Sequence, residues 1–127
     1  LLGHGIGVSG GAMSGRLVFT LKEIDKWRSL EAETPLILAR GDTVPDDIKE
    51  IYAADGLLTA RGGVTSHAAV VAHRLGKTGV VGCGSMRCDE KEKICVFSSV
   101  RLISGDYISI DGREGSVYRG KIELNVT

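Results

Sequence analysis

The sequence predicts one mixed α/β domain with a partly parallel sheet and a flanking antiparallel layer. Its 127 residues suit a single domain with one hydrophobic core. The middle of the chain alternates short apolar runs with amphipathic stretches, which is typical of parallel strands joined by helices. The last third consists of short apolar or alternating runs without helical periodicity, which favours antiparallel strands. These observations together predict the fold class.

The alternation in the middle of the chain predicts each element in turn. Short apolar runs indicate strands at 16–20, 35–39, 56–60 and 79–82. Longer amphipathic runs indicate helices at 22–33, 44–54 and 66–75. Ile24, Trp27 and Leu30 recur on one face of the first helix. Pro45 suits the first turn of the second helix, and Gly76 is a natural end for the third.

The two ends of the chain differ from the middle. Residues 3–15 hold six of the 18 glycines, which predicts loops and tight turns. The pair Asp111-Gly112 predicts a hairpin turn near the end. Strands are expected in this last part at 93–97, 100–104, 107–111 and 116–120.

Composition excludes several classes of function. Lys+Arg and Asp+Glu both number 16, so no basic excess favours nucleic acid or an acidic membrane surface. No apolar run reaches the ~20 residues of a membrane helix, and the start lacks a signal-peptide pattern. The three cysteines are an odd number without a CxxC pair, which predicts reduced thiols in the cytoplasm, or in an organelle, and no metal site. The first residue is not methionine, so we expect a piece of a longer protein.

A histidine stands where a glycine-rich loop is predicted to become a helix, in RGGVTSHAAVVAHRLG. Gly62 and Gly63 allow a sharp approach, and Thr65 or Ser66 is a suitable N-cap. His67 then falls in the first turn, where the helix dipole favours a neutral, nucleophilic imidazole. A phosphoryl group on that ring would meet the backbone N–H groups of a helix N-terminus.

The residues alone leave other roles open for this histidine. His67 could make a structural hydrogen bond at the helix start. A structural role is also expected of His4, in the glycine-rich start, and of His73, as a surface or packed residue inside the helix. Hydrolysis by Ser66 and His67 is disfavoured because the two are adjacent, no acid is placed to orient the ring, and no GxSxG elbow is present. The chain also lacks the glycine-rich loops that bind ATP in P-loop proteins and kinases.

The segment GGVTSHAAVVA closely resembles the phosphorylation-site signature of phosphoenolpyruvate-utilising enzymes. This family includes pyruvate phosphate dikinase, phosphoenolpyruvate synthase and Enzyme I of the sugar phosphotransferase system. The flanking segments LILARGDTVPDDIKEIYAADGLLTARGG and GKTGVVGC are also similar to the family, as are GVSGGAMSGRLVFT and GDYISIDGREGSVYRGKIEL. The likeness covers nearly the whole chain and is weakest at residues 84–99.

The resemblance implies a three-layer β/β/α swivelling phosphohistidine domain over residues 1–127, excised from a larger multidomain enzyme. His67 matches the phosphocarrier histidine, which would shuttle a phosphoryl group between an ATP-grasp domain and a (β/α)8 barrel. There the group would convert pyruvate to phosphoenolpyruvate, so the domain would not be active alone. Thr65 matches a threonine that a regulatory kinase/phosphatase modifies. The resemblance also implies no cofactor in this domain, and magnesium and a monovalent cation in its neighbours.

Several groups near His67 are candidates for holding the phosphate. They are Arg61, Gly62, Gly63, Ser66 and Arg74. Relatives usually have Arg or Gly where His73 stands, and Arg74 points about 100° away from that position on a helix.

The pattern around the histidine favours the dikinase branch, because the synthase usually has Cys in place of Ser66. The synthase and Enzyme I are the alternatives within the family. Outside it, a stand-alone interaction domain without catalysis and a free-standing histidine-phosphorelay protein are the other hypotheses.

Overall fold

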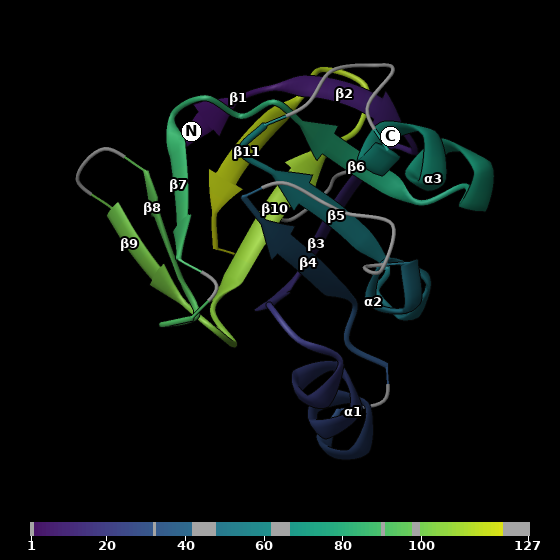
Figure 1. The fold of residues 1–127 in the computed structure, drawn as a ribbon, viewed down its shortest axis with the longest axis vertical. Helices are drawn as coiled ribbons and strands as arrows, with labels where there is room; N and C mark the ends of the chain where they lie inside the picture. Colours follow the sequence, from purple (N-terminus) through teal and green to yellow (C-terminus); the bar gives the residue numbers. More distant parts are fainter. Residues whose placement is uncertain are drawn as a thin grey trace.

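The computed structural model shows three layers, which confirms the predicted β/β/α class (Figure 1). A three-stranded antiparallel sheet lies on one side of an eight-stranded mixed sheet, and helices cover the other side. The structure describes residues 2–31, 33–41, 48–61, 67–89, 91–97 and 100–120.

The elements of the described residues follow the chain in this order. The helices are α1 (Leu21–Leu30), α2 (Ile48–Ala53) and α3 (His67–Leu75). The strands before α3 are β1 (Gly3–His4), β2 (Ile6–Ser9), β3 (Ala12–Val18), β4 (Leu36–Arg40) and β5 (Gly56–Thr59). The strands after α3 are β6 (Thr78–Val81), β7 (Met86–Asp89), β8 (Ile94–Phe97), β9 (Val100–Ile103), β10 (Tyr107–Asp111) and β11 (Ser116–Arg119).

Strands β3, β4, β5 and β6 are neighbours and run parallel, with a helix between each consecutive pair. This confirms the alternation predicted for the middle of the chain. The predicted start of the second helix at residue 44 and its Pro45 lie outside the described residues. Because the four strands are parallel, their carboxyl ends meet at one edge of the sheet, where ligands of α/β proteins commonly bind.

The eight-stranded sheet closes on itself at Gly5. Its order is β1-β11-β10-β3-β4-β5-β6-β2, so β1 and β2 stand at opposite edges although one residue joins them. Strand β1 pairs with β11, and β2 pairs with β6. The Gly5 N–H also donates to the carbonyl oxygen of Gly115 at 2.7 Å. Residues 3–9 therefore connect the two edges of the sheet, as Figure 1 shows along β1 and β2.

Residues 3–15 are mostly strand rather than the predicted loops, because they form β1, β2 and the start of β3. A tight turn is found at Gly10, between β2 and β3, where φ is 78°. The glycines of this segment also serve close backbone approach. A Cβ at Gly5 would lie 2.6 Å from the carbonyl oxygen of Val81, and one at Gly7 would collide with the backbone of Gly112. Glycine inside a strand marks such crowding as well as a turn, and the composition alone does not separate the two cases.

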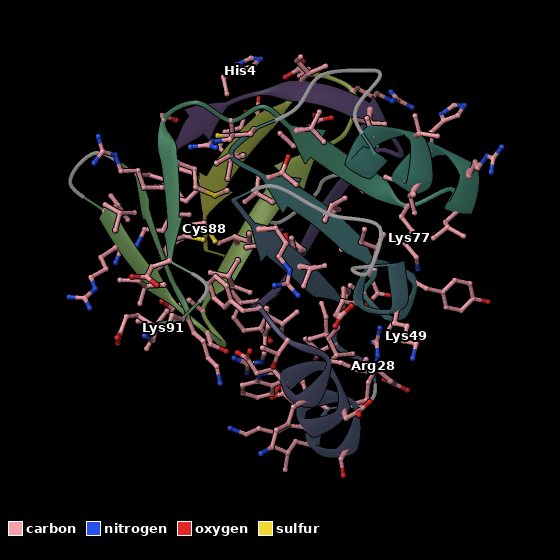
Figure 2. All side chains as sticks on the ribbon, in the orientation of Figure 1. His4, Arg28, Lys49, Lys77, Cys88 and Lys91 are labelled. Carbon is pink, nitrogen blue, oxygen red and sulfur yellow. The ribbon has the colours of Figure 1, made fainter. Side chains whose placement is uncertain are left out.

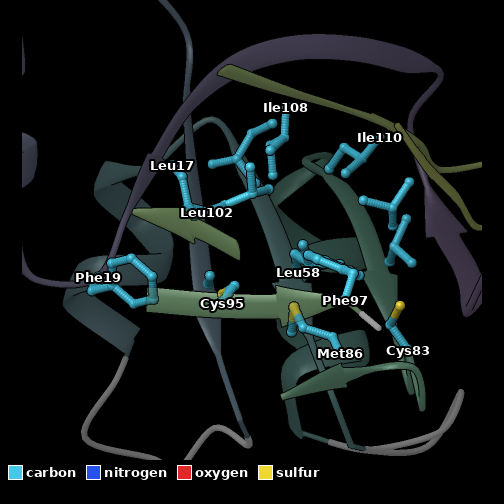
Figure 3. Packing of buried hydrophobic residues seen from close by; sticks show 14 residues of the cluster. Leu17, Phe19, Leu58, Cys83, Met86, Cys95, Phe97, Leu102, Ile108 and Ile110 are labelled. Carbon is cyan, nitrogen blue, oxygen red and sulfur yellow. The ribbon is translucent and has the colours of Figure 1, made fainter. Parts of the chain in front are cut away.

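Two apolar clusters occupy the two faces of the closed sheet. One lies between this sheet and the three-stranded sheet, and Figure 3 shows Leu17, Leu58, Phe97 and Leu102 meeting there. The other lies beneath the helices. Its strand members alternate with those of the first cluster and are Val18, Leu36, Leu38, Leu57 and Val81. The parallel strands are therefore buried on both faces, which explains their continuous apolar runs.

Helix α1 ends earlier than predicted. Thr20 caps its N-terminus, with its Oγ1 accepting from the Glu23 N–H at 3.2 Å and donating to the Glu23 carboxylate. Ile24 is buried as expected, whereas Trp27 is half-buried and Leu30 is 65% exposed. The apolar face therefore narrows along the helix, and its last member lies in solvent.

An arginine clamp joins α1 to the sheet. The Arg16 guanidinium lies 4.3 Å from the ring centre of Trp27 and 4.5 Å from that of Tyr107. It donates to both carboxylate oxygens of Glu31, at 2.8 and 2.9 Å. These hydrogen bonds lower the pKa of Glu31 and raise the pKa of Arg16 relative to their ordinary values.

Candidate active site

His67 is the first residue of α3, which begins one residue later than predicted and keeps His67 in the first turn, as expected. The first N–H groups of a helix have no partner within that helix, and the dipole makes this end electropositive. Gly62, Gly63, Thr65 and Ser66 lie outside the described residues. The structure therefore confirms that the histidine lies at the start of a helix, which is nine residues long.

The small residues after the histidine allow α3 to lie close to the sheet. Ala69 and Ala72 are buried against the strands. A Cβ added to Gly79 of β6 would lie 3.2 Å from the Cβ of Ala72, so larger side chains would push the helix outwards. Val70, on the other side of the helix, is 44% exposed. Packing against the sheet thus explains the small residues Ala69 and Ala72, and it holds in place the helix that begins at His67.

The end of α3 confirms the predicted stop at Gly76. This glycine has a φ of 66°, a left-handed conformation that glycine adopts without steric cost. The Lys77 N–H donates to the carbonyl of Ala72 at 2.9 Å, which closes the helix. His73 and Arg74 are exposed on this last turn.

An open pocket of about 460 Å³ lies at the carboxyl ends of β4 and β5. The Ala60 N–H donates to the carbonyl of Arg40 at 3.1 Å, and the Arg61 N–H donates to that of Gly41 at 3.0 Å. These bonds extend the pairing of the two strands beyond their ends. The residues that line the pocket are Gly41, Ala60, Arg61, Met86, Arg87 and Cys88.

The three-stranded sheet supplies one wall of this pocket through β7, which lies beside β4. Figure 2 labels Cys88 on this wall, facing the strands of the larger sheet. Arg61 and Arg87 bring two cationic side chains to the same opening, and both residues are exposed. Within the part of the chain that the structure describes, neither guanidinium has an ion pair. The pocket is therefore suited to an anionic ligand.

Thr59 fixes the backbone just before residues 62–66. It is fully buried, and its Oγ1 donates to the carbonyl of Arg61 at 2.6 Å. Its own carbonyl accepts from the Cys83 N–H at 3.0 Å. Sequence reasoning singled out neither Thr59 nor Arg87. A threonine ending an apolar run was the only signal for the first, and Arg87 lies in the segment least similar to the family.

The predicted phosphate-supporting arginines do not line the same pocket. Arg61 lines the pocket beside β7, whereas Arg74 lines a second pocket of about 400 Å³ between α3 and β2. His73 lines that second pocket too, together with Gly7 and Val8. The structure thus pairs Arg61 with Arg87 rather than with Arg74.

Among residues 2–31, 33–41, 48–61, 67–89, 91–97 and 100–120, no three His, Cys, Asp or Glu side chains are grouped to hold a metal ion. In the same ranges, no helix has the length and apolar character needed to cross a membrane.

A family model matches most of this chain. Residues 32–115 match the family described as PEP-utilising enzyme, mobile domain. Because the match spans most of the chain, the chain belongs to this family.

Particular relatives are pyruvate, phosphate dikinases. The chain is 43% identical over 124 residues to the chloroplastic pyruvate, phosphate dikinase 1 of Arabidopsis thaliana, which covers 98% of this chain and 13% of that protein. It is 42% identical over 123 residues to the pyruvate, phosphate dikinase of Clostridium symbiosum, which covers 97% of this chain and 14% of that protein. The chain thus spans about one seventh of these relatives, in which the domain is one part of a longer polypeptide.

A solved structure supports the fold. The solution structure of Enzyme I matches with a TM-score of 0.50 and 30% sequence identity. The match covers 73% of this chain and 34% of the Enzyme I chain. The chain is therefore homologous to domains of both pyruvate, phosphate dikinase and Enzyme I.

Proposed function

We propose that His67 is a transient phosphoryl acceptor and that this domain carries the phosphoryl group between two partner domains. The observation that carries the proposal is the position of His67 at the start of α3 in a member of the PEP-utilising family. The helix dipole disfavours a protonated imidazole there, which leaves a nitrogen lone pair free to attack phosphorus.

The proposed reaction is the transfer of a phosphoryl group to an imidazole nitrogen. With phosphoenolpyruvate as donor, an imidazole nitrogen attacks phosphorus, and a nitrogen–phosphorus bond replaces the bond to the enol oxygen. The released enolate takes a proton and becomes pyruvate. The phosphoryl group then carries negative charge at the positive end of α3, which stabilises it. The same group can leave again towards a second acceptor.

A carrier domain needs two partner domains, one that supplies the phosphoryl group and one that receives it. An ATP-grasp domain would exchange the phosphoryl group with nucleotide, and a (β/α)8 barrel would exchange it with pyruvate. Magnesium and a monovalent cation would bind in those domains, whereas this chain would supply the nucleophile and its surroundings. The similarity to pyruvate, phosphate dikinases favours a dikinase reaction. In that reaction, formation of phosphoenolpyruvate from ATP and pyruvate would depend on added inorganic phosphate.

Two neighbours of the histidine would modify this transfer. A phosphate on Thr65, two residues before His67, would add charge and bulk at the position that a phosphoryl donor must approach, and would inhibit transfer. Arg61, one residue before the loop, would stabilise incoming phosphate by charge-assisted hydrogen bonds.

The experiment is to incubate the parent protein with phosphoenolpyruvate labelled with ³²P and to map the modified residue. We expect an acid-labile, base-stable label on His67 that disappears in His67→Asn. His73→Asn is a matched control, because His73 is an exposed histidine of the same helix. Label that persists in His67→Asn, or that is lost equally in His73→Asn, would contradict the assignment.

A further inference from the structure

Two cysteines of the three-stranded sheet face each other across neighbouring strands. Cys88 of β7 is the direct register partner of Cys95 of β8 in their antiparallel ladder. Their sulfur atoms lie 3.7 Å apart, and no disulfide joins them. The hairpin brings the pair together although seven residues separate them in the chain.

The backbone already satisfies the requirements of a disulfide. Directly opposed residues of an antiparallel pair have Cα atoms about 4.5–5.5 Å apart, within the range of about 4.4–6.8 Å that disulfides adopt. The sulfur atoms must approach from 3.7 Å to a bond length of about 2.05 Å. Rotation about the side-chain bonds can supply most of this movement, so the two strands need not separate or slide.

The two thiols differ in access to solvent. Cys88 is half-buried and lines the pocket that also holds Arg61 and Arg87. Cys95 is fully buried on the inner face of β8, as Figure 3 shows beside Phe97. A reagent in the pocket therefore reaches Cys88 first, and Cys95 is positioned behind it to react second.

We propose that Cys88 and Cys95 are a modification site at which the two cysteines form a reversible disulfide with each other. The oxidant is an anionic low-molecular-weight disulfide, such as oxidised glutathione. The Cys88 thiolate attacks one sulfur of the reagent, which gives a mixed disulfide and releases one thiol. The Cys95 thiol then loses its proton and attacks the Cys88 sulfur, which releases the second thiol. Two protein thiols are oxidised and one reagent disulfide is reduced.

The charge of the pocket selects the class of reagent. Arg61 and Arg87 line the opening through which Cys88 is reached, so carboxylates of the reagent are attracted there. Closure of the bond ties β7 to β8 and fixes the pocket wall that carries Arg87. The inference depends on the geometry of the thiols and the charge of the pocket, and not on phosphorylation of His67.

The test uses the 127-residue chain in buffers with stepped ratios of reduced to oxidised glutathione. Free thiols are blocked with iodoacetamide before tryptic digestion, because cleavage after Arg87, Lys91, Lys93 and Arg101 separates the two cysteines. We expect a linked pair of the peptides 88–91 and 94–101 that disappears on reduction. The matched control Cys83→Ser should form the same link. A link to Cys83, or no link at any ratio, would overturn the proposal.

Two variants test the order of reaction and the role of charge. Cys95→Ala should accumulate a glutathione adduct on Cys88, and a folded variant without this adduct contradicts the proposed order. Circular dichroism spectra establish that each variant is folded. Arg87→Met should slow oxidation by oxidised glutathione several-fold and leave oxidation by uncharged 2-hydroxyethyl disulfide unchanged. Equal rates with glutathione before and after this substitution would contradict electrostatic selection.

Discussion

Truncation of Phe97 tests whether apolar packing joins the three-stranded sheet to the closed sheet. Phe97 lies on β8, is 1% exposed and belongs to the cluster between the two sheets. A buried aromatic side chain removes at least ~150 Å² from water, which at ~25 cal/mol per Å² is worth roughly 4 kcal/mol. Measured Phe→Ala substitutions in cores cost ~3–5 kcal/mol, so we expect Phe97→Ala to lower the free energy of unfolding by this amount.

Urea denaturation of the 127-residue chain, followed by circular dichroism, measures the effect. With a slope of about 2 kcal/mol/M, the midpoint should fall by roughly 1.5–2.5 M. Ile103→Ala is the control, because Ile103 belongs to the same small sheet but is 53% exposed, and surface changes usually cost within ~0.5 kcal/mol. A Phe97→Ala effect below ~1 kcal/mol would refute the argument that burial of Phe97 holds the layers together.

Two further predictions concern charged groups. Arg61→Met in the parent protein should slow labelling of His67 by phosphoenolpyruvate roughly 10-fold or more, since a charge-assisted hydrogen bond is worth ~1.5–3 kcal/mol. The control Arg113→Met, at an exposed arginine, should not slow this labelling. Equal labelling rates in the two variants would exclude Arg61 from phosphate binding. Glu31→Gln should lower the free energy of unfolding most at neutral pH. Because Arg16 lowers the pKa of Glu31 in the folded state, this stabilisation is present above the ordinary value of ~4.3 and is lost as pH falls through the lower folded-state pKa. Urea titrations between neutral and acid pH should therefore give free energies of unfolding for the unchanged protein and for Glu31→Gln that converge at low pH. Glu33→Gln is the control. A difference in free energy of unfolding that stays constant with pH would contradict the assignment.

The parallel half of the fold could be predicted because its pattern is local. Strands such as 36–40 and 56–59 are apolar on both faces, and amphipathic stretches stand between them. The start of α3 was also predicted within one residue, since glycines, a capping residue and a small apolar run all mark the same boundary. Local signals that agree with each other thus place His67 in the first turn of its helix from the sequence alone.

The remaining features depend on contacts between distant segments. The glycines of β1 and β2 predicted loops, because the backbone that crowds them, at Val81 of β6 and at Gly112 after β10, lies far along the chain. The pairing of Arg61 with Arg87 depends on how the small sheet lies against β4, which no periodicity encodes. Tertiary placement, rather than secondary structure, is therefore what the sequence pattern left unpredicted.

The closure at Gly5 also affects how molecules of this protein behave towards one another. An unpaired edge strand exposes a row of N–H and C=O groups that can pair with another chain. Here one short segment pairs with β11 on one side and with β6 on the other, so it shields both edges of the large sheet. Detachment of β1 and β2 would expose the unpaired edges of β11 and β6 at the same time. Strand pairing between molecules would then compete with refolding. We therefore expect β1 and β2 to reduce self-association through the edges of the large sheet.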